Sequence, residues 1–336
     1  MRNASIWLKT FVCGFAVVSA MLIVTLLTPP PYGDLSRIGR LSDTEFGWRA
    51  PPPPAPPADA LKGTPIDQAD ILVVGDSFSM TFYWQAPLVQ AGYKVATVYW
   101  GQFGYLCRDF SDWAVRAGFK GRLVIVESVE RLLDERLRKG EPCQTMIKAP
   151  EAKTTPFFKS FTEVPAPVFN WSAKLTSGLV TWRNTRRAKN APGDTSYGKD
   201  TQVRLVPEGC RQFSHALCDR ALFFKEDVDN GPLTAETFDL LKRYTASQSL
   251  PLLWMVIPNK TTVYIDPQHS QPFVGLFGAS TYGPNLFAYA QEQRKRVRDF
   301  YFPNDTHTSM HGQLALGEII LSEVRKRIPE PPPRAP

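Results

Sequence analysis

Four apolar runs, separated by segments of mixed character, dominate the pattern of hydrophobic and polar positions. They lie at 71–74, 93–100, 123–126 and 252–257. Short runs rich in apolar and β-branched residues are typical of strands buried on both faces of a parallel sheet. Helical periodicity is found between and after them, at 79–91, 109–118, 128–138, 234–247, 285–297 and 312–327. This alternation predicts a doubly wound parallel α/β sheet in a domain of residues 67–328.

Three segments fall outside this rhythm. Residues 140–232 are rich in Thr, Ser, Pro and Lys, with short strands predicted at 202–206 and 221–224. We interpret them as an insertion between the third and fourth strands that lies over one edge of a site on the sheet. The Pro-rich residues 29–66 predict an extended polyproline II linker. Residues 329–336 predict a loose Pro-rich tail.

Residues 1–28 have the composition of a membrane anchor. Phe11 to Leu27 is an uncharged apolar stretch, preceded by Arg2 and Lys9. With the apolar residues before Lys9 it reaches the ~20 residues that span a bilayer, and the basic residues favour a cytoplasmic N-terminus. A cleaved signal peptide is the alternative, with a cleavage signature at 18–20, but the apolar run continues beyond it. We expect an uncleaved, single-pass signal anchor in a Gram-negative inner membrane, with the remaining chain in the periplasm.

The composition of the chain limits the classes of partner that we expect it to bind. The chain has 336 residues, 43% of them hydrophobic, and a formal net charge of +7. This content suffices for one large core and a small additional region. Basic residues are scattered among acidic ones, which argues against nucleic acid as a partner. A mildly basic face suits an anionic polysaccharide or a membrane surface.

The cysteines agree with export. Cys13 lies in the apolar stretch, and the even number that remains predicts two disulfides. These cysteines allow three pairings. The short loop favours Cys210–Cys218, which leaves Cys107–Cys143 as its companion. A zinc site is the alternative, but the C-x-x-C pattern is absent, and we expect no metal.

The first strand ends in Gly75-Asp76-Ser77 and is followed by a helical segment. Open α/β sheets bind ligands at this position, and unpaired N–H groups at a helix N-terminus favour developing negative charge. We interpret Ser77 as a nucleophile. The alternative is that Ser77 only caps the helix.

A second loop contains the base and the acid that a nucleophilic serine needs. Residues 304–312 precede the last helical segment and contain Asp305 and His307. A serine hydroxyl needs a base to take its proton, and the base needs an orienting acid. We assign these roles to His307 and Asp305. His311 is the nearest competing base, and the alternative for His307 is an ordinary loop histidine bonded to a backbone group.

Further candidates follow the other strands. The backbone N–H of Ser77 and one from Gly101 or Gly104 would stabilise an oxyanion, unless these glycines only make a turn. Arg131 and Lys260 are candidate substrate-binding side chains. The alternatives are that Arg131 forms an ion pair with Glu127, four residues before it, on one helical face, and that Lys260 is surface charge.

Aromatic residues near these loops would stack on sugar rings, unless they belong to the core. They are Tyr83, Trp84, Tyr99, Trp100 and Tyr105.

Four segments together resemble SGNH-hydrolase-like domains, most closely those of the alginate O-acetyltransferase type. They are Gly75-Asp76-Ser77-Phe78-Ser79, Glu127-Ser128-Val129-Glu130-Arg131, Pro258-Asn259-Lys260-Thr261-Thr262-Val263-Tyr264 and Asp305-Thr306-His307-Thr308. The resemblance covers 70–327 apart from the insertion, and it implies a three-layer α/β/α domain of SGNH or flavodoxin-like type. It assigns nucleophile, base and acid to Ser77, His307 and Asp305. Two features depart from the family: here the serine precedes the Asp-x-His pair, and the Gly-x-Asn-Asp block with its asparagine donor is absent.

The resemblance implies a periplasmic O-acetyltransferase without a cofactor. It would receive an acyl group by way of a membrane-bound O-acyltransferase and transfer it, through an acyl-serine, to a hydroxyl of an exported polysaccharide. One alternative is a carbohydrate esterase with the same catalytic residues. The other is a non-catalytic module that binds polysaccharide or scaffolds an export complex.

Overall fold

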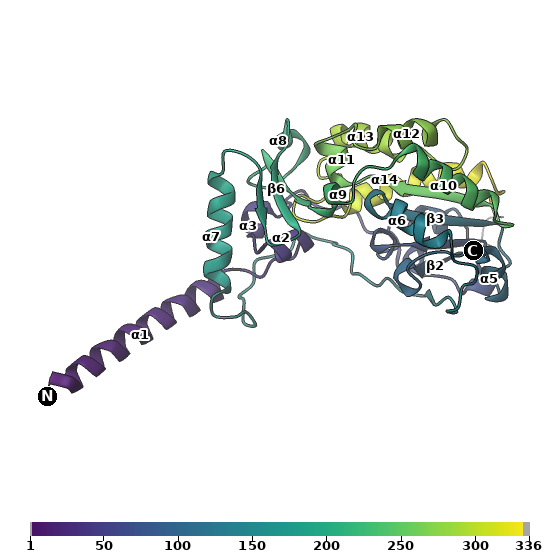
Figure 1. The fold of residues 1–336 in the computed structure, drawn as a ribbon. Helices are drawn as coiled ribbons and strands as arrows, with labels where there is room; N and C mark the ends of the chain where they lie inside the picture. Colours follow the sequence, from purple (N-terminus) through teal and green to yellow (C-terminus); the bar gives the residue numbers. More distant parts are fainter. Residues whose placement is uncertain (1, 332–336) are drawn as a thin grey trace. The chain divides into compact units, whose positions relative to one another are not determined.

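The four apolar runs form the parallel strands of one sheet. In the computed structural model, which describes residues 2–331, these strands are β1 (Ile71–Gly75), β2 (Val95–Tyr99), β3 (Leu123–Val129) and β8 (Leu252–Ile257) (Figure 1). They pair in the order β2-β1-β3-β8. The prediction of an all-parallel sheet is wrong at one edge, because β4 (Ala152–Lys153) pairs antiparallel with β2. The sheet is therefore mixed and mainly parallel.

The strand order changes direction at β1. The chain places β2 on one side of β1 and then β3 on the other. In open α/β sheets the crevice at such a reversal, outside the carboxyl ends of the strands, is where ligands bind. Gly75 at the end of β1 lies opposite Tyr99 at the end of β2, so the loops that follow these strands start side by side.

The core explains why the strand sequences are mostly apolar. Every residue of β1, β3 and β8 is buried. Leu72, Val74, Val126 and Trp254 belong to a cluster with apolar residues of α5 (Phe110–Arg116), α6 (Glu130–Gly140), α10 (Ala235–Ala246) and α12 (Gln271–Gly278). Strands buried on both faces cannot alternate between polar and apolar residues.

The predicted helices are confirmed in type, with one exception. Besides α5, α6 and α10, the chain forms α13 (Leu286–Arg296) and α14 (Met310–Arg325) where helices were expected. The expected helix over 79–91 is wrong: only a 3₁₀ turn at Ser77–Ser79 and α4 (Ala86–Gln90) form. Phe82 has a left-handed backbone with φ of 61°, which a continuous right-handed helix does not allow. The short helices α9 (Glu226–Asp229) and α11 (Lys260–Tyr264) were not predicted.

These strands and helices lie in one of two compact units. That unit contains Pro51–Glu163, Glu226–Tyr301 and the chain from His307 onward, and the other contains the chain up to Ala50, Val164–Lys225 and Phe302–Thr306. Of the Pro-rich tail predicted over 329–336, residues 332–336 lie outside the described residues. We refer to the units as the parallel-sheet unit and the antiparallel-sheet unit.

The antiparallel-sheet unit has a small core of its own. Its strands β5 (Thr195–Tyr197), β6 (Thr201–Leu205) and β7 (Arg220–Phe224) form a meander, and its helices are α1 (Arg2–Leu27), α2 (Asp34–Gly39), α3 (Asp43–Phe46), α7 (Ser177–Asn190) and α8 (Gly209–Gln212). The short strands predicted in the insertion correspond to β6 and β7. The structure differs from the spacer expected over 29–66, because Leu35, Leu41 and Phe46 pack into this core.

The N-terminal helix and the cysteines agree with export. Within α1, the stretch Asn3–Leu27 is long and apolar enough to cross a membrane. The preferred pairing is confirmed, with disulfides Cys107–Cys143 and Cys210–Cys218, and Cys13 is a free thiol. Disulfides persist in oxidising compartments.

Candidate functional site

The turn after β1 has a fixed backbone. The Asp76 side chain accepts a hydrogen bond from Phe78 N (3.1 Å) and so caps the 3₁₀ turn that starts at Ser77. A Cβ at position 75 would lie 2.1 Å from Ser79 Oγ, which explains why glycine stands there. Ser77 therefore does not serve as the cap, and its hydroxyl is available for another role.

Ser77 meets the histidine that the sequence predicts as its base. His307 Nε2 lies 2.8 Å from Ser77 Oγ, and both side chains are half-buried. The Phe78 ring packs on the imidazole at 4.7 Å between ring centroids. The competing His311 instead places its Nε2 3.1 Å from the carbonyl of Pro51. Distance thus selects His307 as the candidate base.

The loop that carries His307 is held at both ends. Thr308 forms a β-bridge with Tyr301, and Ser309 N donates to the carbonyl of Phe300 at 3.0 Å. Ser309 then caps α14 by accepting from Gly312 N. A loop fixed in this way limits the positions that the imidazole can take.

Asp305 belongs to the antiparallel-sheet unit. Its Oδ2 accepts a hydrogen bond from Asp34 N at 2.9 Å, and Thr306 N donates to Asp34 Oδ1 at 2.9 Å. This reciprocal pair fixes the backbone just before His307. The role of Asp305 as the acid that orients His307 stays a prediction.

A buried carboxyl supports the turn from below. Glu127 Oε2 accepts from Asp76 N and from Ser79 Oγ, each at 2.8 Å, and Trp84 Nε1 donates to Ser79 Oγ at 3.1 Å. Glu127 Oε1 has no hydrogen-bond partner among the described residues. The predicted ion pair of Glu127 with Arg131 is wrong, because Glu127 still belongs to β3 and not to the helix that follows.

Arg136 is a residue that the sequence analysis missed. Its Nη1 donates to Asp76 Oδ2 at 3.0 Å and to Ser128 Oγ at 2.8 Å, and its guanidinium lies 4.4 Å from the centroid of Trp100. It thereby connects Asp76 after β1, Trp100 after β2 and Ser128 near the end of β3. The signal was helical spacing: Arg136 comes three residues after Leu133, on the same face of α6 as this buried leucine.

The two carboxyls under the turn differ in their pKa. Burial, and next the charge of Asp76, raise the pKa of Glu127 well above its ordinary value. Burial alone would raise the pKa of Asp76, but the Arg136 guanidinium and the N–H groups of Val129 and Phe78 outweigh it and lower that pKa. The arrangement therefore favours a neutral Glu127 beside an ionised Asp76.

The glycines predicted for the oxyanion are needed for backbone reasons. Gly104 has φ of +77°, and its N–H already donates to the carbonyl of Trp100 at 2.9 Å. A Cβ at Gly101 would lie 2.4 Å from the Tyr99 ring. The prediction is thus wrong for Gly104 in this conformation. Ser77 N stays a candidate donor, because the N–H groups of Asp76, Phe78 and Ser79 already donate within the turn or to Glu127.

The predicted substrate-binding cations are buried. Arg131 Nη1 donates to Asp227 Oδ1 at 3.1 Å, and Asp227 also accepts from Thr261. Lys260 is only 1% exposed. Neither the prediction of an accessible ligand contact nor the alternative of surface charge fits these positions. Arg131 instead connects α6 to α9 and α11.

Most of the aromatic residues considered for sugar stacking belong to the core. Tyr83, Trp84 and Trp100 are buried, and Tyr99 is half-buried against Phe157. Tyr105 is exposed. The alternative that these side chains belong to the core is therefore correct for Tyr83, Trp84 and Trp100.

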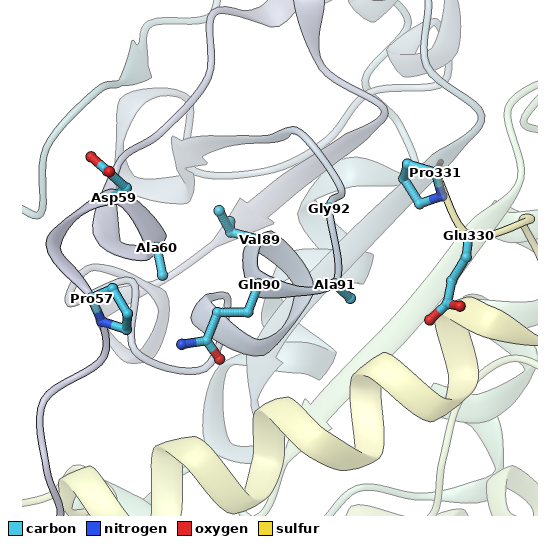
Figure 2. A pocket seen from close by; sticks show the side chains of 9 residues that line it. All are labelled: Pro57, Asp59, Ala60, Val89, Gln90, Ala91, Gly92, Glu330 and Pro331. Carbon is cyan, nitrogen blue, oxygen red and sulfur yellow. The ribbon is translucent and has the colours of Figure 1, made fainter. Parts of the chain in front are cut away.

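Ser77 is not among the residues that line a cavity of about 450 Å³, which Figure 2 shows. Its lining includes Gly92, which precedes β2, and Glu330, which follows α14. It therefore belongs to the amino end of β2, whereas Ser77 follows the carboxyl end of β1. It contains none of the predicted site residues.

No family model, curated protein or solved structure that was compared with the chain matches it.

Proposed function

We propose that this protein is an O-acyltransferase with an acyl-serine intermediate. The observation that carries the proposal is the 2.8 Å contact between Ser77 Oγ and His307 Nε2, at the carboxyl end of β1. A nucleophile and base within hydrogen-bond reach are the minimum for acyl transfer. The buried hydrogen bonds of Asp76 and Glu127 support the proposal, because they hold the nucleophile before substrate arrives.

The transfer takes place in two steps. Ser77 Oγ attacks the acyl carbonyl of an ester or thioester donor, its proton passes to His307 Nε2, and that proton leaves with the donor's alcohol or thiol. An acceptor hydroxyl then gives its proton to His307 and attacks the acyl-serine, which releases the acylated acceptor and returns the proton to Ser77. The Ser77 N–H would stabilise the oxyanion in both steps.

The setting of the reaction follows from the N-terminal helix and the disulfides. An apolar helix of membrane-spanning length, and disulfides in both units, support an anchored protein in an oxidising compartment. The basic residues before the apolar stretch favour an inner-membrane anchor with the folded units in the periplasm. The resemblance noted in the sequence supplies acetyl as the acyl group, a membrane-bound O-acyltransferase as its source, and a polysaccharide as the acceptor.

An esterase is the second candidate. Ser77 and His307 are both half-buried rather than buried, so water reaches the pair in this structure. Acyl transfer requires water to be excluded while the acceptor hydroxyl enters. A carbohydrate esterase would use the same residues with water as the acceptor.

The test uses the full chain in detergent micelles with an acetyl-ester donor and a panel of oligosaccharides. Mass spectrometry should find acetyl on Ser77 and then on sugar, and Ser77→Ala should lose both products. Ser247→Ala changes an exposed serine on the same unit and should keep both. Acetyl on Ser77 that passes only to water supports the esterase. If Ser77→Ala keeps full turnover, the proposed chemistry is wrong.

A further inference from the structure

The end of the apolar helix α1 is joined tightly to a distant part of the chain. Thr25 Oγ1 donates to the carbonyl of Leu175 at 2.7 Å and accepts from Gly178 N at 3.1 Å. Asn170 N donates to the carbonyl of Leu26 at 3.0 Å. A Cβ at Gly178 would lie 2.5 Å from Thr25 Cα, so the start of α7 touches the α1 backbone. Figure 1 shows α7, in teal, beginning beside the end of the purple α1.

Because of this junction, the residues beside it lie at a defined depth relative to a membrane that α1 spans. A helix of 26 residues is about 39 Å long at ~1.5 Å per residue, about 9 Å more than the ~30 Å hydrocarbon core. The last turn of α1 therefore lies at the boundary between lipid and water. Residues 170–178 are bonded to that turn, so they lie at the same boundary.

The residues around the junction expose large apolar side chains. Trp171 is 79% exposed, Trp182 is 56% exposed, and Phe169 packs edge-on against Trp171 at 5.9 Å between centroids. Val168 and Leu179 are exposed as well. Exposed aromatic rings in water are unfavourable, whereas Trp is enriched at membrane interfaces because its ring is apolar and its N–H is polar.

A cavity of about 380 Å³ adjoins these residues. Leu27 at the end of α1 lines it, and so do Trp182, Arg186 and Lys189 of α7. The Arg186 guanidinium lies 5.3 Å from the centroid of the Trp182 ring. Glu45 is the carboxylate in the lining, so the cations outnumber it.

We propose that this cavity binds the phosphate group of an anionic phospholipid. The lipid's acyl chains would extend along α1 into the bilayer, while Arg186 and Lys189 hold the headgroup. The exposed rings of Phe169, Trp171 and Trp182 would lie in the interface beside it. The argument for a lipid is continuity: the cavity is lined by the end of a helix that is apolar enough to cross the membrane. It depends on this anchor and not on the proposed acyl transfer.

The test is native mass spectrometry of the full chain, released from nanodiscs of phosphatidylcholine mixed with an equal part of phosphatidylglycerol. We expect phosphatidylglycerol to be retained in preference to phosphatidylcholine. Arg186→Gln combined with Lys189→Gln should weaken its binding roughly thirtyfold at low salt, since each cation near a membrane surface contributes ~1 kcal/mol. The matched control, Arg211→Gln with Lys199→Gln, removes the same charge from exposed residues of the same unit outside the cavity, and it should keep the binding.

Four results would overturn the proposal. Equal retention of the two lipids would remove the role of the phosphate charge. Equal losses in the cavity variant and the control variant would show a general charge effect. A photoreactive residue in place of Trp182 that crosslinks in membranes to another protein, and not to phospholipid, would assign the surface to that partner. Inorganic phosphate added in excess should displace little phosphatidylglycerol, and full displacement would make this a site for free phosphate.

Discussion

In the parallel-sheet unit, the side chains at the carboxyl ends of β1 and β3 are polar, buried and bonded to one another, whereas the antiparallel-sheet unit exposes aromatic rings and cations around α7. Asp76 and Glu127 have their donors within the fold, while Trp171 and Trp182 are largely exposed. Buried polar groups that satisfy one another fix a geometry, as catalysis requires. Exposed apolar side chains that cluster on a surface mark a site where an external partner binds. This contrast supports the two proposals, chemistry in the first region and membrane contact in the second.

The largest expected effect comes from removing the candidate general base, His307. His307→Ala removes the group that takes the proton of Ser77, and we expect kcat/KM for acyl transfer to fall roughly 10²–10⁴-fold. His311→Ala is the matched control, because its imidazole contacts the carbonyl of Pro51 and not Ser77. Steady-state kinetics with an acetyl ester measures both. Equal activity of the two variants would refute the role of His307.

The next effect concerns the cation beneath the turn. Arg136→Met keeps the bulk of the side chain but leaves the buried Asp76 carboxylate without its ion pair, and removing one partner of a buried pair costs about 3–5 kcal/mol. Arg138→Met, on the same helix, removes the ion pairs with Asp134 and Glu236, in which the arginine side chain is 46% exposed, and such surface pairs contribute ~0–1 kcal/mol each. Urea unfolding should separate the two variants clearly. Similar losses would mean that Asp76 does not depend on Arg136.

The disulfides test whether the units unfold separately. Cys107–Cys143 lies in the parallel-sheet unit with a separation of 36 residues, and Cys210–Cys218 in the antiparallel-sheet unit with a separation of 8. Loop-closure entropy predicts losses of about 4 and about 2.5 kcal/mol when the respective pairs are replaced by serine. Calorimetry should show each loss in a different transition. A shift of one common transition by both variants would show that the units unfold together.

The sequence predicted the parallel sheet better than the smaller one. Apolar strands such as 123–126 are buried on both faces, and their composition alone indicates this. The antiparallel-sheet unit combines three separate pieces of chain, so its core pairs Leu35 and Phe46 with Leu222. Local patterns contain no information about such distant pairs, and the prolines around the first piece indicated a linker instead.

At the site, the sequence identified residue types correctly but not their burial. Ser77 and His307 were predicted as partners because each lies beside a recognisable signal: Ser77 follows a strand end, and His307 precedes a helix start. Arg131 and Lys260 were predicted as ligand contacts because each lies in a segment that follows a predicted strand, where open α/β sheets bind ligands. The structure buries both, and only tertiary packing determines that outcome.

The smallest expected effect is a dependence of the free energy of unfolding on pH, caused by the buried carboxyls of the parallel-sheet unit. Burial raises the pKa of Glu127 well above the ordinary value of 4.5, so the folded state holds a proton that the unfolded state has already lost. The free energy of unfolding should therefore fall as pH rises from 4.5 through the folded pKa, by at most about 1.4 kcal/mol per pH unit. Asp76, whose pKa is lowered from 3.8, acts in the opposite direction and only in more acidic solution.

Glu127→Gln should reduce this fall in the free energy of unfolding, while the control Glu141→Gln, at an exposed position after α6, should preserve it. Urea unfolding measured from about pH 5 to about pH 8 distinguishes these outcomes, and an unchanged slope in Glu127→Gln would show that this carboxyl does not retain its proton in the folded chain.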